Sequence, residues 1–510
     1  MNTQFTFEGR QKAVFGGMMA VGVLCLGLTF MNDDEFHTRF WTNFLHNSVF
    51  FTGISFTALF LLCALMTAYS GWQTVIKRIW EAYSLFLVVG MLLMGVVVAG
   101  VWGHFHHLYH WADAAAVAKD KILTHKSSFL NKGWFTLATF GFVGTWAFFA
   151  FKLRGMSKQE DVAGTNAYEI HKKMKPWAAG FMPIGGFTSA AVIWQWVMSI
   201  DAHWYSTMFA WYATASFLVS MFALTIMILI YLKSNDYFSY VTAEHLHDLG
   251  KFLFGFSIFW TYLWFSQFML IWYANNGEET IYFRERFDHY KVLFFANLVM
   301  NFVLPLFILI RNDVKRKFGS MFFMAALIFF GHWVDFFLMI KPGAFKIAQE
   351  AREEMKAEAH SHTGMDTKTI KAEAVLTSAQ EPVKAAEAVK EVAKEATHST
   401  VEAVKEGTEK AAEGAKEAVH GAVEATTEAT HEGGEGHAAH VAGAEHKAGE
   451  GHHEEVEASR AGFDFPLLLE VGTMLGFLGL FLFFVFSCLE KASLFPGNDP
   501  YIEESLNHHV

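Results

Sequence analysis

The chain has 510 residues, of which 53% are hydrophobic and 16% aromatic, whereas only 17% carry a charge. Much of its net charge of −11 belongs to one segment outside the membrane, and the charges lie almost entirely outside long apolar runs. We expect no nucleic-acid partner. The composition excludes an ordinary water-soluble domain and indicates an integral membrane protein.

Runs of about 20 apolar residues can cross a bilayer as helices. Ten such runs occur, at about 13–31, 46–69, 80–103, 134–153, 178–199, 206–232, 251–274, 290–310, 318–340 and 467–488. No small-residue cleavage site follows the first run, so we interpret it as a retained helix rather than a signal peptide. The predicted fold is therefore all-α, with ten transmembrane helices.

Basic residues set the expected orientation. They precede the first span and follow the second, fourth, sixth and eighth, as at Arg10, Lys77, Lys152, Lys233 and Arg311. The positive-inside rule makes these segments cytoplasmic, although lysines in the 103–133 loop weaken the contrast. With ten spans, both termini are then expected in the cytoplasm.

The composition changes between about residues 343 and 461, which are rich in Ala, Glu, Lys, Thr and His. The triplet Glu-Ala-Val recurs at Glu387, Glu402 and Glu417, yet no face is apolar enough to fold alone. We expect a disordered or weakly helical periplasmic insert between a nine-helix membrane domain (1–342) and the tenth helix with its cytoplasmic tail (462–510). Its His-rich end fixes no coordination geometry, so we interpret it as a solvated tether.

Polar residues deep in a span are costly and therefore candidates for function. His332 and Asp335 lie well inside the ninth span and are one helical turn apart, so the carboxylate is expected to hold the imidazole. The pair would exchange protons or hydrogen-bond a quinone, with a polar latch between helices as the alternative.

The stretch "HDLGKFLFGF" opens the seventh span. Glu244, His247, Asp248 and Lys251 share one helix face, and Tyr262 with Ser266 continues roughly the same stripe, with Gln267 beside it. This face is either a proton entrance or a set of ordinary ion pairs at the membrane interface.

Other polar positions give weaker signals. We place Asp201 and His203 of "SIDAHWYS" in a tight turn at the periplasmic rim, and Glu470 at the interface. Asn297 and Asn301 are expected to bond between helices. His106 and His110 of "HFHHLYHW" have metal-like spacing without a completing carboxylate or cysteine, so we expect a rim feature rather than a metal site.

The three cysteines fall inside predicted spans, with no CxxC or CxxCH, so the chain offers no ligands for an iron–sulfur cluster or c-type haem. A b-type haem needs paired deep histidines, and only His332 is deep. We therefore expect no metal and no redox cofactor on this chain.

The segments "SIDAHWYSTMFAWY" and "HDLGKFLFGFSIFWTYLWFSQFMLIWYANNGEET", with the ten-span layout, closely resemble the F subunit (ActF) of bacterial alternative complex III. That complex is a quinol:cytochrome c oxidoreductase, and the subunit is similar to NrfD/PsrC-type membrane proteins. The resemblance covers about residues 10–345 and 462–500 and leaves out the insert.

The resemblance implies two four-helix bundles with a flanking helix pair, in the bacterial cytoplasmic (inner) membrane. Implied partners are an iron–sulfur protein, a multihaem cytochrome c, a sister NrfD-like C subunit and, in some assemblies, a terminal oxidase. Haem c and iron–sulfur clusters belong to these partners, and quinol oxidation is attributed mainly to the C subunit. The present chain would then translocate protons or offer a second quinone site, for which His332, Asp335 and Gln267 are the candidates.

A proton path would enter at the 244–251 face and leave past His332, Asp335, Asp201 and His203. Two alternatives stay open. One is a secondary transporter, whose broken helices would have to lie at Pro183 with Gly185 and Gly186, or at Pro305. The other is a purely structural scaffold subunit of a respiratory complex.

Overall fold

The computed structural model describes residues 4–377 and 462–508. Within them, ten helices are long and apolar enough to cross a membrane, which confirms the predicted fold class. The uninterrupted ones are α1 (Gly9–Met31), α2 (Thr38–Thr67), α9 (Ala167–Trp196), α10 (Met208–Ser234), α11 (Ala243–Ala274), α16 (Phe318–Thr377) and α19 (Leu468–Leu489). The composite ones are α3 (Lys77–Leu85) with α4 (Leu87–Gly103), α7 (Lys132–Thr136) with α8 (Val143–Val162), and α13 (Lys291–Leu298) with α14 (Leu304–Leu309).

Several helices begin before the apolar runs that predict them. The seventh run was predicted to begin near 251, whereas α11 begins at Ala243 after a capping box formed by Thr242 and His245. Apolarity marks only the part of a helix that lies in hydrocarbon, while capping groups set where the backbone hydrogen bonds start. The polar face at 244–251 is therefore helical.

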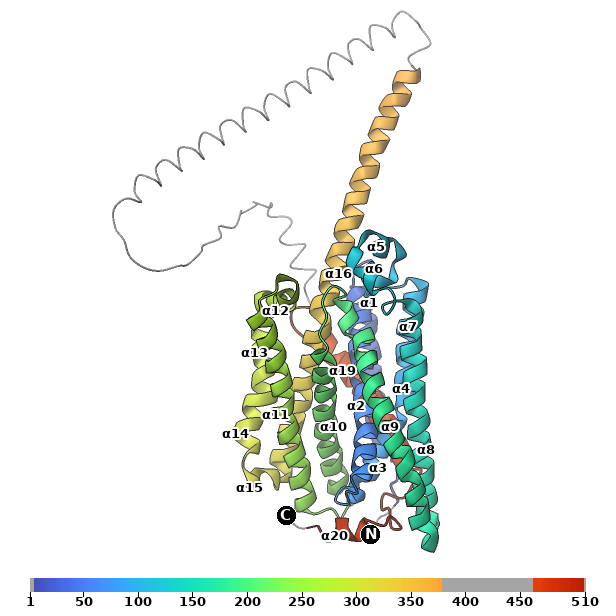
Figure 1. The fold of residues 1–510 in the computed structure, drawn as a ribbon, viewed down its shortest axis with the longest axis vertical. Helices are drawn as coiled ribbons and strands as arrows, with labels where there is room; N and C mark the ends of the chain where they lie inside the picture. Colours follow the sequence, from blue (N-terminus) through green and yellow to red (C-terminus); the bar gives the residue numbers. More distant parts are fainter. Residues whose placement is uncertain (1–3, 378–461, 509–510) are drawn as a thin grey trace, which may run out of the picture. The chain divides into compact units, whose positions relative to one another are not determined.

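The helices form two four-helix bundles and a flanking pair (Figure 1). The first bundle contains α2, α3 with α4, α8 and α9, and the second contains α10, α11, α13 with α14, and α16. Helix α10 packs against both α2 and α9 and so joins the bundles.

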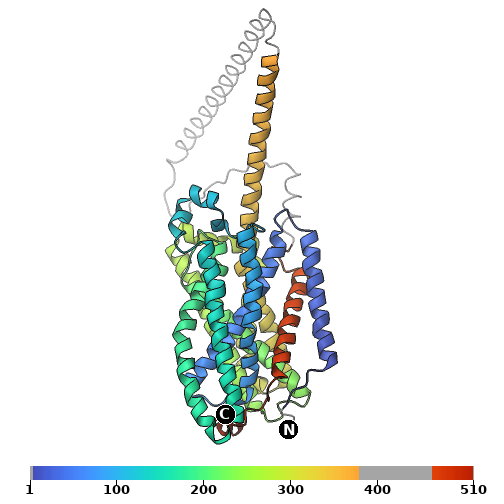
Figure 2. The same cartoon turned by 90° about the vertical axis from the view of Figure 1, so that its right-hand side faces the viewer.

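Helices α1 and α19 lie side by side although they are at opposite ends of the sequence (Figure 2). Glycines permit this approach: a Cβ atom at Gly22 would collide with the backbone of Gly476. Such close backbone contact between small residues is a common way for membrane helices to associate.

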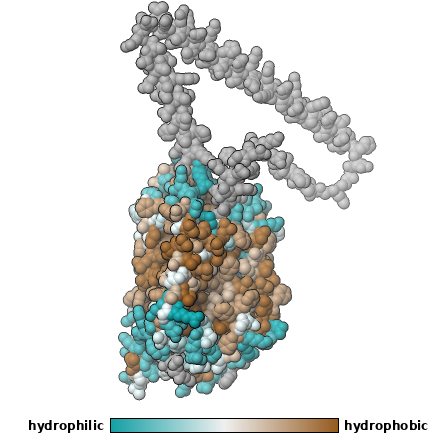
Figure 3. All heavy atoms as spheres, turned by 180° about the vertical axis from the view of Figure 1, so that it is seen from behind, coloured by the Kyte–Doolittle hydropathy of each residue, from teal (hydrophilic) through white to brown (hydrophobic). Residues whose placement is uncertain are grey.

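Short helices lie at the two ends of the bundles. The end that carries both termini, here called the termini end, has α15 (Asn312–Lys315) and α20 (Ile502–Leu506), and the opposite end has α5 (Ala114–Lys119), α6 (Lys121–Lys126) and α12 (Gly277–His289). Figure 3 shows a belt of apolar side chains between two hydrophilic zones, as expected of a surface that faces lipid.

The chain divides into one compact unit of Met1–Ala351 and Glu454–Val510 and a second of Arg352–His453. Helix α16 continues beyond residue 343, where the composition changes, and Ala344, Phe345 and Ile347 are still buried. The Glu-Ala-Val repeat and the His-rich tract lie outside the described residues.

Candidate functional site

Asp335 of α16 is the centre of a buried polar cluster in the second bundle. Its carboxylate is fully buried and accepts hydrogen bonds from three other helices. Trp260 Nε1 of α11 donates at 3.0 Å, Asn297 Nδ2 of α13 donates at 2.8 Å, and the hydroxyl of Tyr212 on α10 also donates. A carboxylate with three donors is well satisfied inside a membrane protein, so Asp335 ties the bundle together.

His332 is also fully buried, but it does not bond to Asp335, and that sequence prediction was wrong. Its Nδ1 lies 2.9 Å from the hydroxyl of Ser216 on α10, and its Nε2 has no partner among the described residues. The two side chains separate because other helices occupy both carboxylate oxygens of Asp335.

The local backbone at this cluster is irregular for a reason visible in the sequence. Pro305 lacks the N–H that would bond to the carbonyl of Asn301, four residues earlier. The chain forms a π-helical turn at Val299–Val303, and Asn301 is buried there and donates to Asn297 at 2.6 Å. Such turns often occur at functional sites in membrane and soluble helices. The expected hydrogen bond between helices is confirmed for Asn297, which donates to Asp335, whereas Asn301 donates to Asn297 within the same span.

A small cavity extends from this cluster toward the opposite end. It is lined by Tyr212 and Asn297, which bind Asp335, and by Gln267, Tyr282 and Arg286. Its volume is about 20 Å³, which is enough for about one water molecule. A ligand of drug size needs several hundred Å³, so this space suits water and not a quinone ring.

A wider polar cleft opens beyond this cavity. Tyr282 and Arg286 line both spaces and so form the wall between them, and Asp201 and His203 line the cleft. The predicted rim residues Asp201 and His203 thus line a cleft that shares two wall residues with the cavity beside the Asp335 cluster.

Arg286 closes the wall with a fixed set of bonds. It is 3% exposed, and its Nε and Nη1 donate to the carbonyls of Leu338 at 3.0 Å and Tyr282 at 2.7 Å. Its Nη2 lies 3.8 Å from the Asp201 carboxylate. Burial raises the pKa of Asp201, and the nearby Arg286 charge opposes that rise. A carboxyl group whose pKa moves toward neutrality is suited to exchanging protons with water.

The tight turn predicted at Ser199–Ser206 is present, because α9 ends at Trp196 and α10 begins at Met208. His203 projects to the rim and hydrogen-bonds the carboxylate of Asp120, the N-cap residue of α6. That hydrogen bond lowers the pKa of Asp120.

The predicted entrance at the termini end consists of separate pairs. Glu244 pairs with Arg316 at 2.9 Å, and Asp248 pairs with Lys251 at 2.9 Å and with His508 of the C-terminal tail. Residues of this face thus form one pair among themselves and otherwise bind the C-cap residue of α15 and the tail, and they do not join into a single chain of hydrogen bonds.

Two residues of the predicted stripe lie on the outside of α11. The side chain of Tyr262 is 62% exposed and that of Lys251 43%, whereas Ser266 and Gln267 face the bundle. Lys251 and Tyr262 are about three helical turns apart and so share a face, as predicted, but that face is the outer one. The correction for Tyr262 is therefore that its hydroxyl lies on the outer surface of α11 and not on a path through the bundle.

Apolar side chains separate the two clusters. Trp260 lies twelve residues beyond Asp248 on α11, a rise of roughly 18 Å. Leu249 and Leu253 are buried in that interval. Ser257 is the buried hydroxyl between the clusters on the bundle face of α11, and its hydroxyl has no partner among the described residues.

Sequence reasoning missed a second buried charge cluster near the opposite end. Arg39 Nε donates to Glu470 at 2.8 Å, Asn43 donates to the same carboxylate at 3.2 Å, and Lys341 donates to Asn43 at 2.6 Å. Glu470, which we expected at the interface, is only 1% exposed. Its position near the start of α19 looked peripheral in the sequence, but α2 and α16 cover it. Lys341, the lysine directly before Pro342, is the sequence signal that could have predicted this buried cluster.

The two bundles also meet through hydrogen bonds between α2 and α16. Trp333 Nε1 donates to Asn47 at 3.0 Å, and the carbonyl of Trp333 lies 3.0 Å from Nε2 of His46. His46 is 1% exposed, because α16 covers it.

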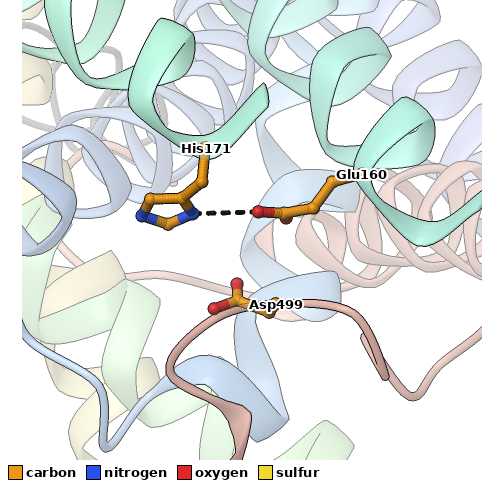
Figure 4. Close-up of side chains that lie close together, drawn as sticks. All are labelled: Glu160, His171 and Asp499. Carbon is orange, nitrogen blue, oxygen red and sulfur yellow. Dashed lines mark hydrogen bonds and ion pairs between the residues drawn. The ribbon is translucent and has the colours of Figure 1, made fainter. Parts of the chain in front are cut away.

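At the termini end, Glu160, His171 and Asp499 come together from α8, α9 and the tail (Figure 4). Their ligand-type atoms lie within 4.8 Å of one another, a spacing that suits a metal ion. However, the Lys77 ammonium is 3.1 Å from Glu160 and also pairs with Asp499. Because that ammonium supplies the positive charge, the trio forms a buried ion-pair cluster that holds the tail.

The His106 and His110 pair does not converge on one point. His106 is buried with its Nε2 3.2 Å from the carbonyl of Val97, and burial lowers the pKa of His106 to about 4. His110 lines the polar cleft instead.

No family model matches this chain, and no curated protein matches its sequence.

Proposed function

We propose that this protein is an integral membrane subunit of a bacterial quinol:cytochrome c oxidoreductase of the alternative complex III type, and that it moves protons through its second bundle. The observation that carries the proposal is the route from the fully buried Asp335 through a water-sized cavity to a polar cleft at the opposite end. The resemblance in the spans around 199–279 supports the type of complex.

In the proposed mechanism Asp335 alternates between its charged and protonated forms. Three donors stabilise the carboxylate, and a proton on either oxygen would displace the Tyr212 or the Trp260 hydrogen bond. The Tyr212 hydroxyl would then give its own proton to water in the adjoining cavity and take the proton of Asp335 in exchange, which restores both groups. The next acceptor is Asp201, whose carboxyl group lies beyond Arg286.

Arg286 has a specific task in this scheme. Its buried positive charge stands in the wall between cavity and cleft, and it repels a free hydronium ion that approaches from either side. A proton therefore passes outward only when Asp201 is unprotonated and ready to accept it. The basic residues at the termini end favour a cytoplasmic location there, so release at Asp201 would be periplasmic.

Proton uptake is assigned to the Asp248 cluster, and Ser257 is the polar group between that cluster and Trp260. The apolar interval means that this half of the route would fill with water only during turnover. The apolar interval would therefore act as a gate for proton uptake. The small size of the cavity beside Gln267 favours the proton role over a quinone site at Asp335 and His332.

Electron transfer is assigned to partner subunits, namely the iron–sulfur protein, the multihaem cytochrome c and the sister C subunit. The three cysteines are buried on different helices, and no two of them are spaced as cluster ligands. The transporter alternative depends on helices broken near the midplane. Helix α9 runs without interruption through Pro183, and the chain stays helical through the π-helical turn before Pro305, so neither candidate gives a broken helix and that alternative is weaker.

The first test is purification from the native membrane in mild detergent, followed by identification of the companions, haem spectra and quinol:cytochrome c activity. Co-purification with multihaem and iron–sulfur subunits is expected. A solitary and colourless protein would remove the respiratory assignment and favour a transporter.

The second test measures protons moved per electron in vesicles that contain the assembled complex. Asp335→Asn, His332→Ala and Asp248→Asn should assemble and transfer electrons but move fewer protons. Asp313→Asn is the matched control, because Asp313 is an exposed residue at the termini end. Normal proton movement in all three assembled variants would leave only the scaffold role.

A further inference from the structure

The largest of the cavities described here lies between the helix pair and the second bundle, away from Asp335. It has a volume of about 560 Å³ and is bounded by α1, α19, α10 and α16. That volume falls within the range of about 300–1,000 Å³ found for sites that hold small organic molecules. The proposed proton route does not use it.

The lining of this cleft changes character with depth. At the termini end it carries Arg10, Gln11 and Asn235, and deeper along the helices it carries Val14 and Leu224. Leu224 lies eleven residues from Asn235 on α10, so the apolar part extends roughly 16 Å into the membrane. Polar groups at the interface and hydrocarbon below them match a molecule with one polar end and a long apolar body.

Most polar groups at the mouth are already used within the protein. Gln11 Nε2 donates to the Tyr231 hydroxyl at 3.1 Å, and Gln11 Oε1 accepts from the backbone of Glu8 at 3.2 Å. Asn235 Nδ2 donates to the carbonyl of Tyr231 at 2.8 Å. Glu8 is the N-cap residue of α1 and part of its capping box.

Arg10 is the exception at the mouth. Its side chain is exposed, and it makes no ion pair or hydrogen bond with any side chain that the structure describes. A guanidinium group binds a phosphate through two parallel hydrogen bonds. Arg10 therefore provides charge complementarity for a phosphate group at the level of the membrane surface.

We propose that this cleft is a binding site for one membrane phospholipid, with its phosphate on Arg10 and an acyl chain along Val14, Leu224 and Leu478. The site is built by the helix pair, so the bound lipid would fill the space between α1 with α19 and the second bundle. It stands independently of the proposed proton path.

The test uses the intact protein purified from its native membrane and washed with detergent until bulk lipid is gone. Phospholipid that stays bound is counted by native mass spectrometry, and rebinding is measured with phosphatidylglycerol and phosphatidylethanolamine as probes. Wild-type protein should retain one phospholipid per chain.

Two pairs of variants locate that lipid. Val14→Trp fills the cleft from its open side and should abolish retention, whereas Val23→Trp, at an exposed position farther along α1 and outside the cleft, should not. Arg10→Gln should raise the Kd about tenfold, because a charge-assisted hydrogen bond contributes on that scale. Lys12→Gln, which changes a lysine stacked on Phe7, should have no effect.

A photo-cross-linking residue at position 14 keeps the test decisive if Val14→Trp does not fold. Capture of a head-group-labelled phospholipid supports the site. Capture of a polypeptide would overturn the proposal in favour of a partner helix in the cleft. Retention that is unchanged in both Val14→Trp and Arg10→Gln, or no retained phospholipid in the wild type, would also overturn it.

Discussion

His332 and Asp335 stand one turn apart on α16, yet their side chains bind different helices and not each other. Asp335 accepts from Trp260 at 3.0 Å, while His332 lies 2.9 Å from the hydroxyl of Ser216. The carboxylate is thus held by donors fixed on other helices, and the imidazole keeps a free Nε2 within the described residues. Two buried groups with separate partners can change protonation independently, whereas in a His–Asp ion pair the charge of each group would affect the protonation of the other.

Replacing Asp335 should affect stability in graded steps. Asp335→Ala leaves three buried donors without an acceptor, at a cost of about 1–3 kcal/mol each. Asp335→Asn keeps one acceptor oxygen and should cost clearly less. Thermal unfolding in detergent measures both variants. Equal losses would mean that the donors find other partners and that Asp335 does not organise the bundle.

Removing the positive charge of Arg286 from the wall between the cavity and the cleft should increase passive proton leak through the protein. Arg286→Gln loses the bonds to Leu338 and Tyr282 and the charge that separates the cavity from the cleft. Passive proton flux into vesicles should rise severalfold. Arg284→Gln is the control, since that side chain is 81% exposed on the same short helix. Equal flux in the two variants would contradict the proposed role of the wall.

Asp201 should give the protein a distinct pH dependence. Burial raises the pKa of Asp201 above its ordinary value of 3.8, so the folded state holds this proton more tightly than the unfolded state. The resulting stabilisation is present below the unfolded-state pKa and is lost as the pH rises through the folded-state value.

The measurement is thermal stability against pH for the wild type and Asp201→Asn. Relative to the variant, the wild type should lose stability from about pH 4 upward until the raised pKa is passed, and the two curves should run parallel at higher pH. Curves that diverge in the opposite sense would show that Arg286, and not burial, dominates at Asp201.

The buried Glu470 should be among the most sensitive positions. Glu470→Ala leaves Arg39 as a nearly buried charge and removes the acceptor of Asn43, and breaking such a buried pair costs about 3–5 kcal/mol. Changing Arg39 and Glu470 together to apolar residues should recover much of that loss. Unfolding in detergent tests the coupling, and simple additivity of the single losses would rule it out.

The helix pair should depend on a glycine contact. Gly22→Leu inserts a side chain where α1 and α19 touch at Gly476, so the pair must separate. Gly16→Leu is the control on the same helix, because nothing lies near a Cβ at that position. Disulfide cross-linking between engineered cysteines on α1 and α19 should fall only in the Gly22 variant.

Much of the architecture could be predicted from the sequence because lipid imposes a simple rule. A chain in hydrocarbon must satisfy its own backbone hydrogen bonds, so each apolar run of sufficient length becomes a helix. The number and approximate position of the ten spans followed from that rule. The polar residues of functional interest, Asp335, His332 and Asp201, were also visible, because polar groups are rare in such runs.

The pairing of these residues could not be predicted. Helical spacing suggested that Asp335 would hold His332 and that Tyr262 would belong to the proton path, but His332 binds Ser216 and Tyr262 is exposed on the outer face of α11. Spacing reports which residues share a face of one helix, but hydrogen bonds in a bundle form between helices, and their relative rotation depends on packing across the whole interface.

The sequence by itself therefore determined that the protein is an all-α membrane protein of ten helices, because apolar length and the need for internal hydrogen bonds are local properties. Only the tertiary structure decided that Asp335 binds three other helices, that Arg286 walls off its cavity, and that Glu470 is buried with Arg39. Those facts depend on residues that are far apart in the chain, and their proximity arises from helix packing.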